Sequence, residues 1–126
     1  MKNKISSLIV WAVLITIMTT ATAQKKQQHA NVRGTWTMTV ETSAGTGSPV
    51  FELQHVTDTS LSGTYSGRLG EAAVKGTVQN NIIHLEFTIS GNLIEYDGTV
   101  ENDTMKGKVK LGSIGEGTFT GSKKKS

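Results

Sequence analysis

Apolar and polar residues alternate one by one along most of the chain after residue 33. Trp36, Met38 and Val40 alternate with threonines, and the same period recurs as far as Phe119. Gly, Asn, Asp and Ser interrupt this alternation at short intervals. A two-residue period with such breaks is typical of short β-strands joined by tight turns. We expect eight strands, at residues 34–40, 50–56, 61–65, 72–79, 82–90, 93–101, 104–111 and 118–120.

Two-residue turns predict how neighbouring strands pair. Turns centred on Gly91-Asn92 and Leu69-Gly70 predict the pairs Phe87 with Tyr96, Glu86 with Asp97, Tyr65 with Val74, and Gly63 with Gly76. Turns at Asn80-Asn81 and Asn102-Asp103 predict the pairs Val78 with Ile83, Lys75 with Glu86, Tyr96 with Val109, Asp97 with Lys108, and Gly98 with Gly107. The hairpins then have one apolar face and one charged face.

All six aromatic residues after residue 23 fall on the apolar face, namely Trp36, Phe51, Tyr65, Phe87, Tyr96 and Phe119. A long meander with one apolar face has to cover that face, and the sequence offers no helix to do so. We therefore expect an all-β fold, an eight-stranded antiparallel up-and-down β-barrel, with a two-sheet sandwich as the alternative. Glycines inside the strands either leave space in the interior or mark places where the sheet coils tightly.

The first residues carry the pattern of an export signal. Lys2 and Lys4 precede an apolar run at residues 5–18, and Ala21-Thr22-Ala23 forms a small-x-small cleavage site. The run is shorter than the roughly 20 residues that a membrane span needs. We expect a signal peptide at residues 1–23, a flexible lead-in at 24–32, the barrel domain at 33–122 and a basic tail at 123–126. The exported protein would be secreted or periplasmic.

Charge and cysteine content restrict the partners. Loss of Lys2 and Lys4 with the signal peptide lowers the formal charge from +3 to +1, so the domain is close to neutral and we expect no nucleic-acid binding. The chain has no Cys. No disulfide therefore supports the fold, and the apolar core has to suffice.

The opening Gly34-x-Trp36, followed by an eight-stranded meander, resembles the calycins, the superfamily of lipocalins, fatty-acid-binding proteins and avidins. The run Leu61-Ser62-Gly63-Thr64-Tyr65 also resembles an avidin strand. Together these features span most of residues 33–122, and they are similar too to glycine-rich β domains of secreted bacterial proteins. The resemblance implies a ligand-binding barrel. It implies no biotin site, because Met38 stands where avidins have an asparagine. Lipocalins usually have an arginine in the last strand that packs on the tryptophan, and the only candidates for it in this sequence are Lys123 and its neighbours.

No motif of enzyme chemistry stands out. The outward row Lys75, Glu86, Asp97 and Lys108 contains two carboxylates that could act as acid and base or bind a cation, but interleaved opposite charges are common on solvated sheets. His29, His55 and His84 lack metal-ligand spacing. We expect no catalytic residues, no metal site and no cofactor.

The inward face is nearly all apolar, and an eight-stranded barrel either fills with its own side chains or holds one small ligand. Our leading expectation is a binding module for a small apolar ligand, contacted by Trp36, Phe51, Tyr65, Phe87 and Tyr96. The alternative is a structural or interaction module that engages an extracytoplasmic protein through the loops at 42–49 and 111–117.

Overall fold

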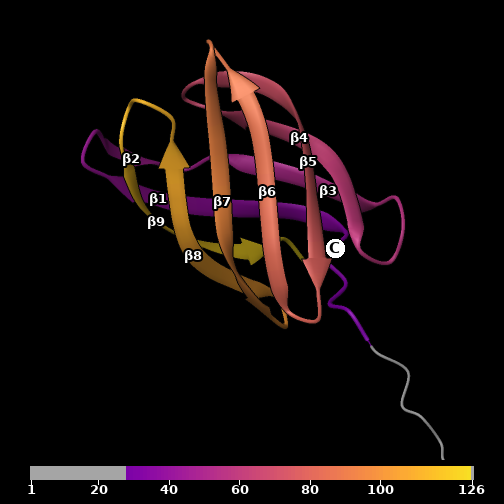
Figure 1. The fold of residues 1–126 in the computed structure, drawn as a ribbon. Helices are drawn as coiled ribbons and strands as arrows, with labels where there is room; N and C mark the ends of the chain where they lie inside the picture. The colour runs from indigo at the N-terminus through magenta and orange to yellow at the C-terminus, as the bar shows by residue number, and fades with distance from the viewer. Residues whose placement is uncertain (1–27, 126) are drawn as a thin grey trace, which may run out of the picture.

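The structure, a computed structural model, describes residues 28–125 (Figure 1). Within this range the chain forms one antiparallel sheet of nine strands. The strands are β1 (Gly34–Thr42), β2 (Gly45–Gly47), β3 (Val50–His55), β4 (Ser60–Gly67), β5 (Gly70–Gln79), β6 (Ile82–Ile89), β7 (Asn92–Glu101), β8 (Thr104–Leu111) and β9 (Glu116–Lys123). In residues 28–125, no helix is long and apolar enough to cross a membrane.

Eight of these strands close into a barrel in chain order, because β1 pairs with β9 from Trp36 opposite Lys123 to Thr42 opposite Gly117. The expected eight-stranded up-and-down barrel is therefore confirmed. The ninth strand, β2, lies in the segment expected to be a loop and pairs with the second half of β1. Because β3 pairs only with Gly34 to Thr37, the second half of that edge of β1 is free for β2 to pair with.

The barrel interior is a single apolar core. Nineteen hydrophobic residues are buried, and within residues 28–125 no polar or charged residue is. The six aromatic residues are all among them, each at most 4 % exposed. Burial of a large apolar side chain stabilises a fold by about 1.5–3 kcal/mol. The inward placement expected for the aromatic residues is thus confirmed.

The strand glycines lie where neighbouring backbones approach closely. A Cβ atom on Gly98 would come within 2.0 Å of the Lys106 carbonyl oxygen, and one on Gly107 would meet the Asp97 carbonyl oxygen at 2.0 Å. Gly63 and Gly76 face equivalent clashes. These glycines mark tight coiling of the sheet and do not leave open space inside it.

Two of the four expected hairpin registers are confirmed and two are wrong. The β5–β6 and β7–β8 pairs are those expected, including Gly98 with Gly107. In β4–β5 and β6–β7 the turns are Arg68-Leu69 and Ser90-Gly91, so each register is shifted by two residues. The observed pairs are Tyr65 with Ala72, Gly63 with Val74, Leu61 with Gly76, Phe87 with Ile94, Leu85 with Tyr96, Glu86 with Glu95, and His84 with Asp97.

The two ends of the barrel differ. At one end the segment before β1 covers the core, where Val32 is fully buried and its carbonyl oxygen accepts a 2.9 Å hydrogen bond from Trp36 Nε1. The Val32 amide donates to His55 Nε2 over 3.1 Å, and the Ala30 amide donates to the Asn80 carbonyl oxygen over 2.7 Å. Residues 29–32 of the expected lead-in therefore contact the barrel.

The remaining domain expectations concern the chain ends. The expected signal peptide at 1–23 and the lead-in residues 24–27 lie outside the described residues, as does residue 126. Lys123 is the last residue of β9. The Lys124 amide donates to the Thr35 carbonyl oxygen over 2.7 Å, so the start of the expected basic tail runs beside β1.

Candidate functional site

The barrel end opposite Val32 holds a pocket of about 280 Å³. The β1–β2 hairpin and the Arg68-Leu69 turn form its rim. Its inner wall is mostly apolar and comprises Val40, Pro49, Phe87, Ile94 and Leu111, together with the rings of Tyr65 and Tyr96. Binding sites for small molecules typically have about 300–1,000 Å³. The pocket is slightly smaller than the lower limit of this range.

Packed aromatic rings separate the pocket from the rest of the core. Tyr65 and Phe87 stack with their ring centroids 4.2 Å apart. The ring of Phe51 packs edge-on against that of Tyr96, and Tyr96 packs in the same way against Phe119; the ring centroids are 5.0 Å apart in both pairs. Contacts of this kind contribute about 0.5–1.5 kcal/mol each beyond area burial. The middle of the barrel is therefore filled by its own side chains, and the open space lies at one end.

Besides Thr42 and Thr46 of the β1–β2 hairpin, three polar side chains line this pocket, those of Tyr96, Tyr65 and Arg68. Burial raises the pKa of the Tyr96 phenol far above its ordinary value, and the nearby Tyr65 phenol raises it further. Burial also raises the pKa of Tyr65, against the opposing effect of a hydrogen bond from the Leu69 backbone. Both phenols are therefore neutral near pH 7. The third side chain is Arg68, the one charged residue among those that line the pocket.

Arg68 also holds the rim in place. Its Nη1 donates a hydrogen bond to the Thr46 carbonyl oxygen, which joins the β4–β5 turn to β2. On the other side of the hairpin, the Met38 amide donates to the Pro49 carbonyl oxygen over 2.9 Å. The β1–β2 hairpin is thus a flap beside the pocket, and the Arg68 guanidinium connects it to the neighbouring β4–β5 turn.

The structure separates the five expected ligand-contacting residues into two groups. Tyr65, Phe87 and Tyr96 line the pocket, whereas Trp36 and Phe51 are fully buried and are not part of its lining. Trp36 lies towards the closed end, where Lys123 Nζ is 5.7 Å from the centroid of its ring. Sequence reasoning missed Arg68 as a pocket residue, because the expected register paired it with Glu71.

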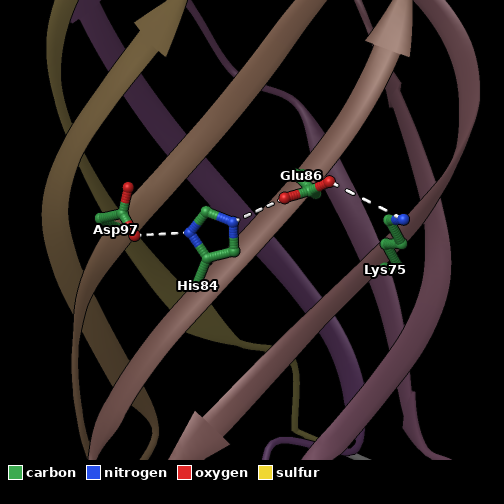
Figure 2. A network of polar contacts seen from close by, with 4 residues as sticks. All are labelled: Lys75, His84, Glu86 and Asp97. Carbon is green, nitrogen blue, oxygen red and sulfur yellow. Dashed lines mark hydrogen bonds and ion pairs between the residues drawn. The ribbon is translucent and has the colours of Figure 1, made fainter.

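A second cluster lies on the outer face of β6 and β7 (Figure 2). His84 Nδ1 is 2.6 Å from Asp97 Oδ1, and His84 Nε2 is 2.9 Å from Glu86 Oε1. Lys75 Nζ is 3.9 Å from the other Glu86 oxygen, and the Lys75 side chain is 79 % exposed. The expected outward row of Lys75, Glu86, Asp97 and Lys108 is wrong as a single row, since Glu86 lies opposite Glu95 and Asp97 lies opposite His84.

The carboxylates set the charge of His84. Partial burial by itself lowers the pKa of His84, but hydrogen bonds to Glu86 and Asp97 and their negative charges outweigh it and raise the pKa above its ordinary value. Ionised carboxylates only accept hydrogen bonds. An imidazolium that donates from both ring nitrogens therefore fits between them.

Glu95 completes this group. His84, Glu86 and Glu95 each offer one potential metal-ligating atom, and these atoms lie within 4.8 Å of one another. All three residues are half-buried. Sequence reasoning singled out Glu86 and Asp97 but did not bring them together with His84 and Glu95, because His84 lies opposite Asp97 and Glu86 lies opposite Glu95 only in the observed register.

Comparisons with known proteins support the fold. No protein-family model and no characterised protein matches the chain by sequence. Among solved structures, a redesigned β-barrel is similar with a TM-score of 0.61 and 16% identity, over 75% of this chain and 92% of that one. A de novo fluorescence-activating β-barrel is similar with a TM-score of 0.54 and 18% identity, over 73% and 93%. The redesigned barrel mFAP1, bound to DFHBI, is similar with a TM-score of 0.56 and 14% identity, over 74% and 94%.

Proposed function

We propose that the protein is an exported, non-enzymatic binding module whose β-barrel holds a small, mostly apolar ligand in the pocket beneath the β1–β2 hairpin. The observation that carries this proposal is the pocket itself, about 280 Å³ of space that ends in a floor of packed aromatic rings. A barrel with no ligand to hold could fill this end with larger side chains, as it does in the middle.

The polar groups of the pocket suggest what the ligand carries. The neutral phenols of Tyr65 and Tyr96 can each donate one hydrogen bond, and the Arg68 guanidinium lies at the rim. Few polar groups on an apolar wall usually set the orientation of a bound molecule. A ligand with an apolar body and an oxygen acceptor, such as a carbonyl or a carboxylate facing Arg68, suits this arrangement.

Two likenesses support the proposal at the level of the fold. The opening Gly34-x-Trp36 resembles that of the calycins, a superfamily of barrels that bind small molecules, and Lys123 lies beside Trp36, with its Nζ 5.7 Å from the centroid of the ring. The similar barrel mFAP1 binds DFHBI. Export rests on the signal-peptide pattern of residues 1–23.

Filling the pocket tests the proposal. Leu111→Trp places a large ring where a half-buried leucine lines the pocket, and Leu93→Trp places the same ring on an outer position that is 46 % exposed. We would titrate each variant with a panel of small aromatic and aliphatic acids, ketones and alcohols and follow backbone amide NMR shifts. Binding should perturb the amides of Gly45, Gly47 and Leu69 in the wild type and in Leu93→Trp, and should be lost in Leu111→Trp.

Two results would contradict a pocket ligand. One is binding that persists in Leu111→Trp with the same perturbed amides. The other is a panel that perturbs the closed end near Val32 and leaves the pocket rim unchanged.

A specific observation favours the alternative of an interaction module. Three exposed hydrophobic side chains lie at the pocket end, those of Leu69 in the β4–β5 turn, Leu93 at the start of β7 and Ile114 in the loop between β8 and β9. A partner protein could cover them together with the segments at 42–49 and 111–117. In that case Leu93→Trp and Leu69→Asp would weaken binding to the partner, whereas Leu111→Trp would not.

A further inference from the structure

The four residues at the centre of the β6–β7 hairpin form a square on its outer face. His84 and Glu86 are two positions apart on β6 and therefore point the same way. Asp97 lies directly opposite His84 on β7, and Glu95 lies directly opposite Glu86. Carboxylates directly opposite each other on neighbouring strands are destabilising unless a positive charge lies between them. The square therefore favours a cation.

From this juxtaposition we propose that His84, Glu86 and Glu95 bind a divalent transition-metal ion, with zinc as the reference, and that Asp97 positions His84 for it. The inference is independent of the pocket at the barrel end.

The ligand atoms are close enough for one ion. Zinc bonds to imidazole nitrogen and carboxylate oxygen are about 2.0–2.2 Å long, so ligand atoms in a tetrahedral site stand about 3.4 Å apart. His84 Nε2 and Glu86 Oε1 are 2.9 Å apart, and all three candidate ligand atoms lie within 4.8 Å of one another. The ligand atoms would therefore have to move by only a few tenths of an ångström to about 1.5 Å to reach the spacing of a zinc site, which side-chain rotations can provide. The ion would replace the proton between His84 Nε2 and Glu86.

Asp97 supplies the outer contact that metal-binding histidines commonly have. Its Oδ1 accepts a 2.6 Å hydrogen bond from His84 Nδ1, which directs Nε2 towards the two glutamates. A carboxylate in this place fixes the tautomer and makes the ring a stronger ligand. Asp97 is thus a positioning residue and does not itself contact the ion.

The neighbouring lysines leave room for the ion. Lys75 is 3.9 Å from Glu86 and its side chain is 79 % exposed, so it can move away at little cost. Lys110 lies opposite Glu95, but among residues 28–125 these two side chains form no ion pair. Three protein ligands leave a fourth position open to water or to a group from a partner.

Zinc titration of the purified protein tests this site. The protein should carry no histidine tag and should first be stripped of metal with a chelator. Isothermal titration calorimetry with Zn²⁺ alone should give one ion per chain. His84→Ala and Glu95→Gln should each weaken binding by about tenfold or more. Glu52→Gln, an exposed glutamate on β3, and His29→Gln should bind as the wild type does.

Three further measurements separate a metal site from a structural ion pair. Glu95→Gln should keep or slightly raise the wild-type melting temperature in chelator, because it removes a carboxylate that lies opposite Glu86 and, among residues 28–125, Glu95 has no hydrogen bond or ion pair with His84. It should nevertheless lose the rise in melting temperature that zinc causes. Asp97→Ala should weaken zinc binding by about 10–100-fold, and Asp97→Asn, which keeps an acceptor oxygen, should restore most of it. Substituted Co²⁺ should show visible bands of a four-coordinate site that His84→Ala abolishes.

The proposal is overturned if zinc fails to bind with one-to-one stoichiometry. It is also overturned if Glu95→Gln binds zinc as tightly as the wild type, or if His29→Gln weakens binding as much as His84→Ala does.

Discussion

Tyr96 carries a hydroxyl into the core of the barrel. The residue is only 2 % exposed, and its ring contacts Phe51 and Phe119 at 5.0 Å. Burial disfavours the phenolate, which is why the pKa of Tyr96 is raised, and the pKa of Tyr65 is raised for the same reason. Each phenol therefore holds its proton to a higher pH in the folded protein than in the unfolded chain.

This difference predicts alkaline sensitivity. Below about pH 10, the ordinary value for tyrosine, both states keep the proton and the two phenols have no effect on the pH dependence. As the pH rises above 10, the unfolded chain releases these protons first, and the free energy of unfolding falls by up to about 1.4 kcal/mol per pH unit for each phenol. Above pH 10, the free energy of unfolding of Tyr96→Phe should therefore fall less steeply with pH than that of the wild type.

Denaturant unfolding of both proteins at pH 8, 10 and 11 would measure the effect. Lysines also titrate in this range, but they do so in both proteins and therefore cancel in the comparison. Parallel curves for the wild type and Tyr96→Phe above pH 10 would contradict the buried, neutral phenol.

The place of a single residue was predictable where it depends only on whether the side chain points to the inner or the outer face of the sheet. The alternation placed all six aromatic residues inside, because facing depends only on whether a position is odd or even along a strand. Arg68 and His84 were not predictable in the same way. Their roles depend on which residues lie opposite them and on the path of the β1–β2 hairpin. The alternation of apolar and polar residues indicates neither.

At the scale of the strands, registers were predictable only in part. A shift of one residue would turn the apolar face outward, so the pattern excludes it. A shift of two residues keeps every side chain on its face, and the pattern cannot detect it. Only turn chemistry decides, and Ser90 and Gly91 both adopt positive φ, of 52° and 80°, as a type I′ turn requires.

The second misplaced turn has a related cause. Gly70 has a φ of 120° and is the first residue of β5, so the glycine follows the turn and is not at its centre. The two asparagine-led turns were placed correctly, because Asn80 and Asn102 each adopt a φ of 57° at the first turn position. Asparagine tolerates this conformation better than most residues.

The close approach of β7 and β8 gives a prediction at this scale. Gly98→Ala would place a methyl group 2.0 Å from the Lys106 carbonyl oxygen and should lower the free energy of unfolding by about 1–3 kcal/mol, because the strands have to separate. Gly47→Ala is the matched control, since its added methyl would meet Arg68 Cδ at an ordinary 3.4 Å. It should change stability by no more than about 0.5 kcal/mol.

Thermal or denaturant unfolding of the two variants measures this difference. Equal stability of Gly98→Ala and Gly47→Ala would contradict the tight coiling of the barrel at this pair.

For the whole molecule, the contrast between the two barrel ends matters most. One end is covered by the segment that contains Val32 and by Trp36, and the other keeps a pocket beside a hairpin that Arg68 connects to the β4–β5 turn. Closure of the barrel was predictable, because one apolar face on consecutive strands leaves few other solutions. The flap was not, because the Gly- and Ser-rich stretch at 42–49 carries no alternation from which β2 could be inferred.

The central claim is that this pocket holds a small molecule. Native mass spectrometry of the wild type and of Leu111→Trp, each purified from the cells that produce it, tests the claim most directly. We predict that the wild type carries an additional mass of a few hundred daltons that denaturation releases, and that Leu111→Trp does not. A wild-type mass equal to that of the bare polypeptide, or a bound mass that Leu111→Trp retains, would contradict the claim.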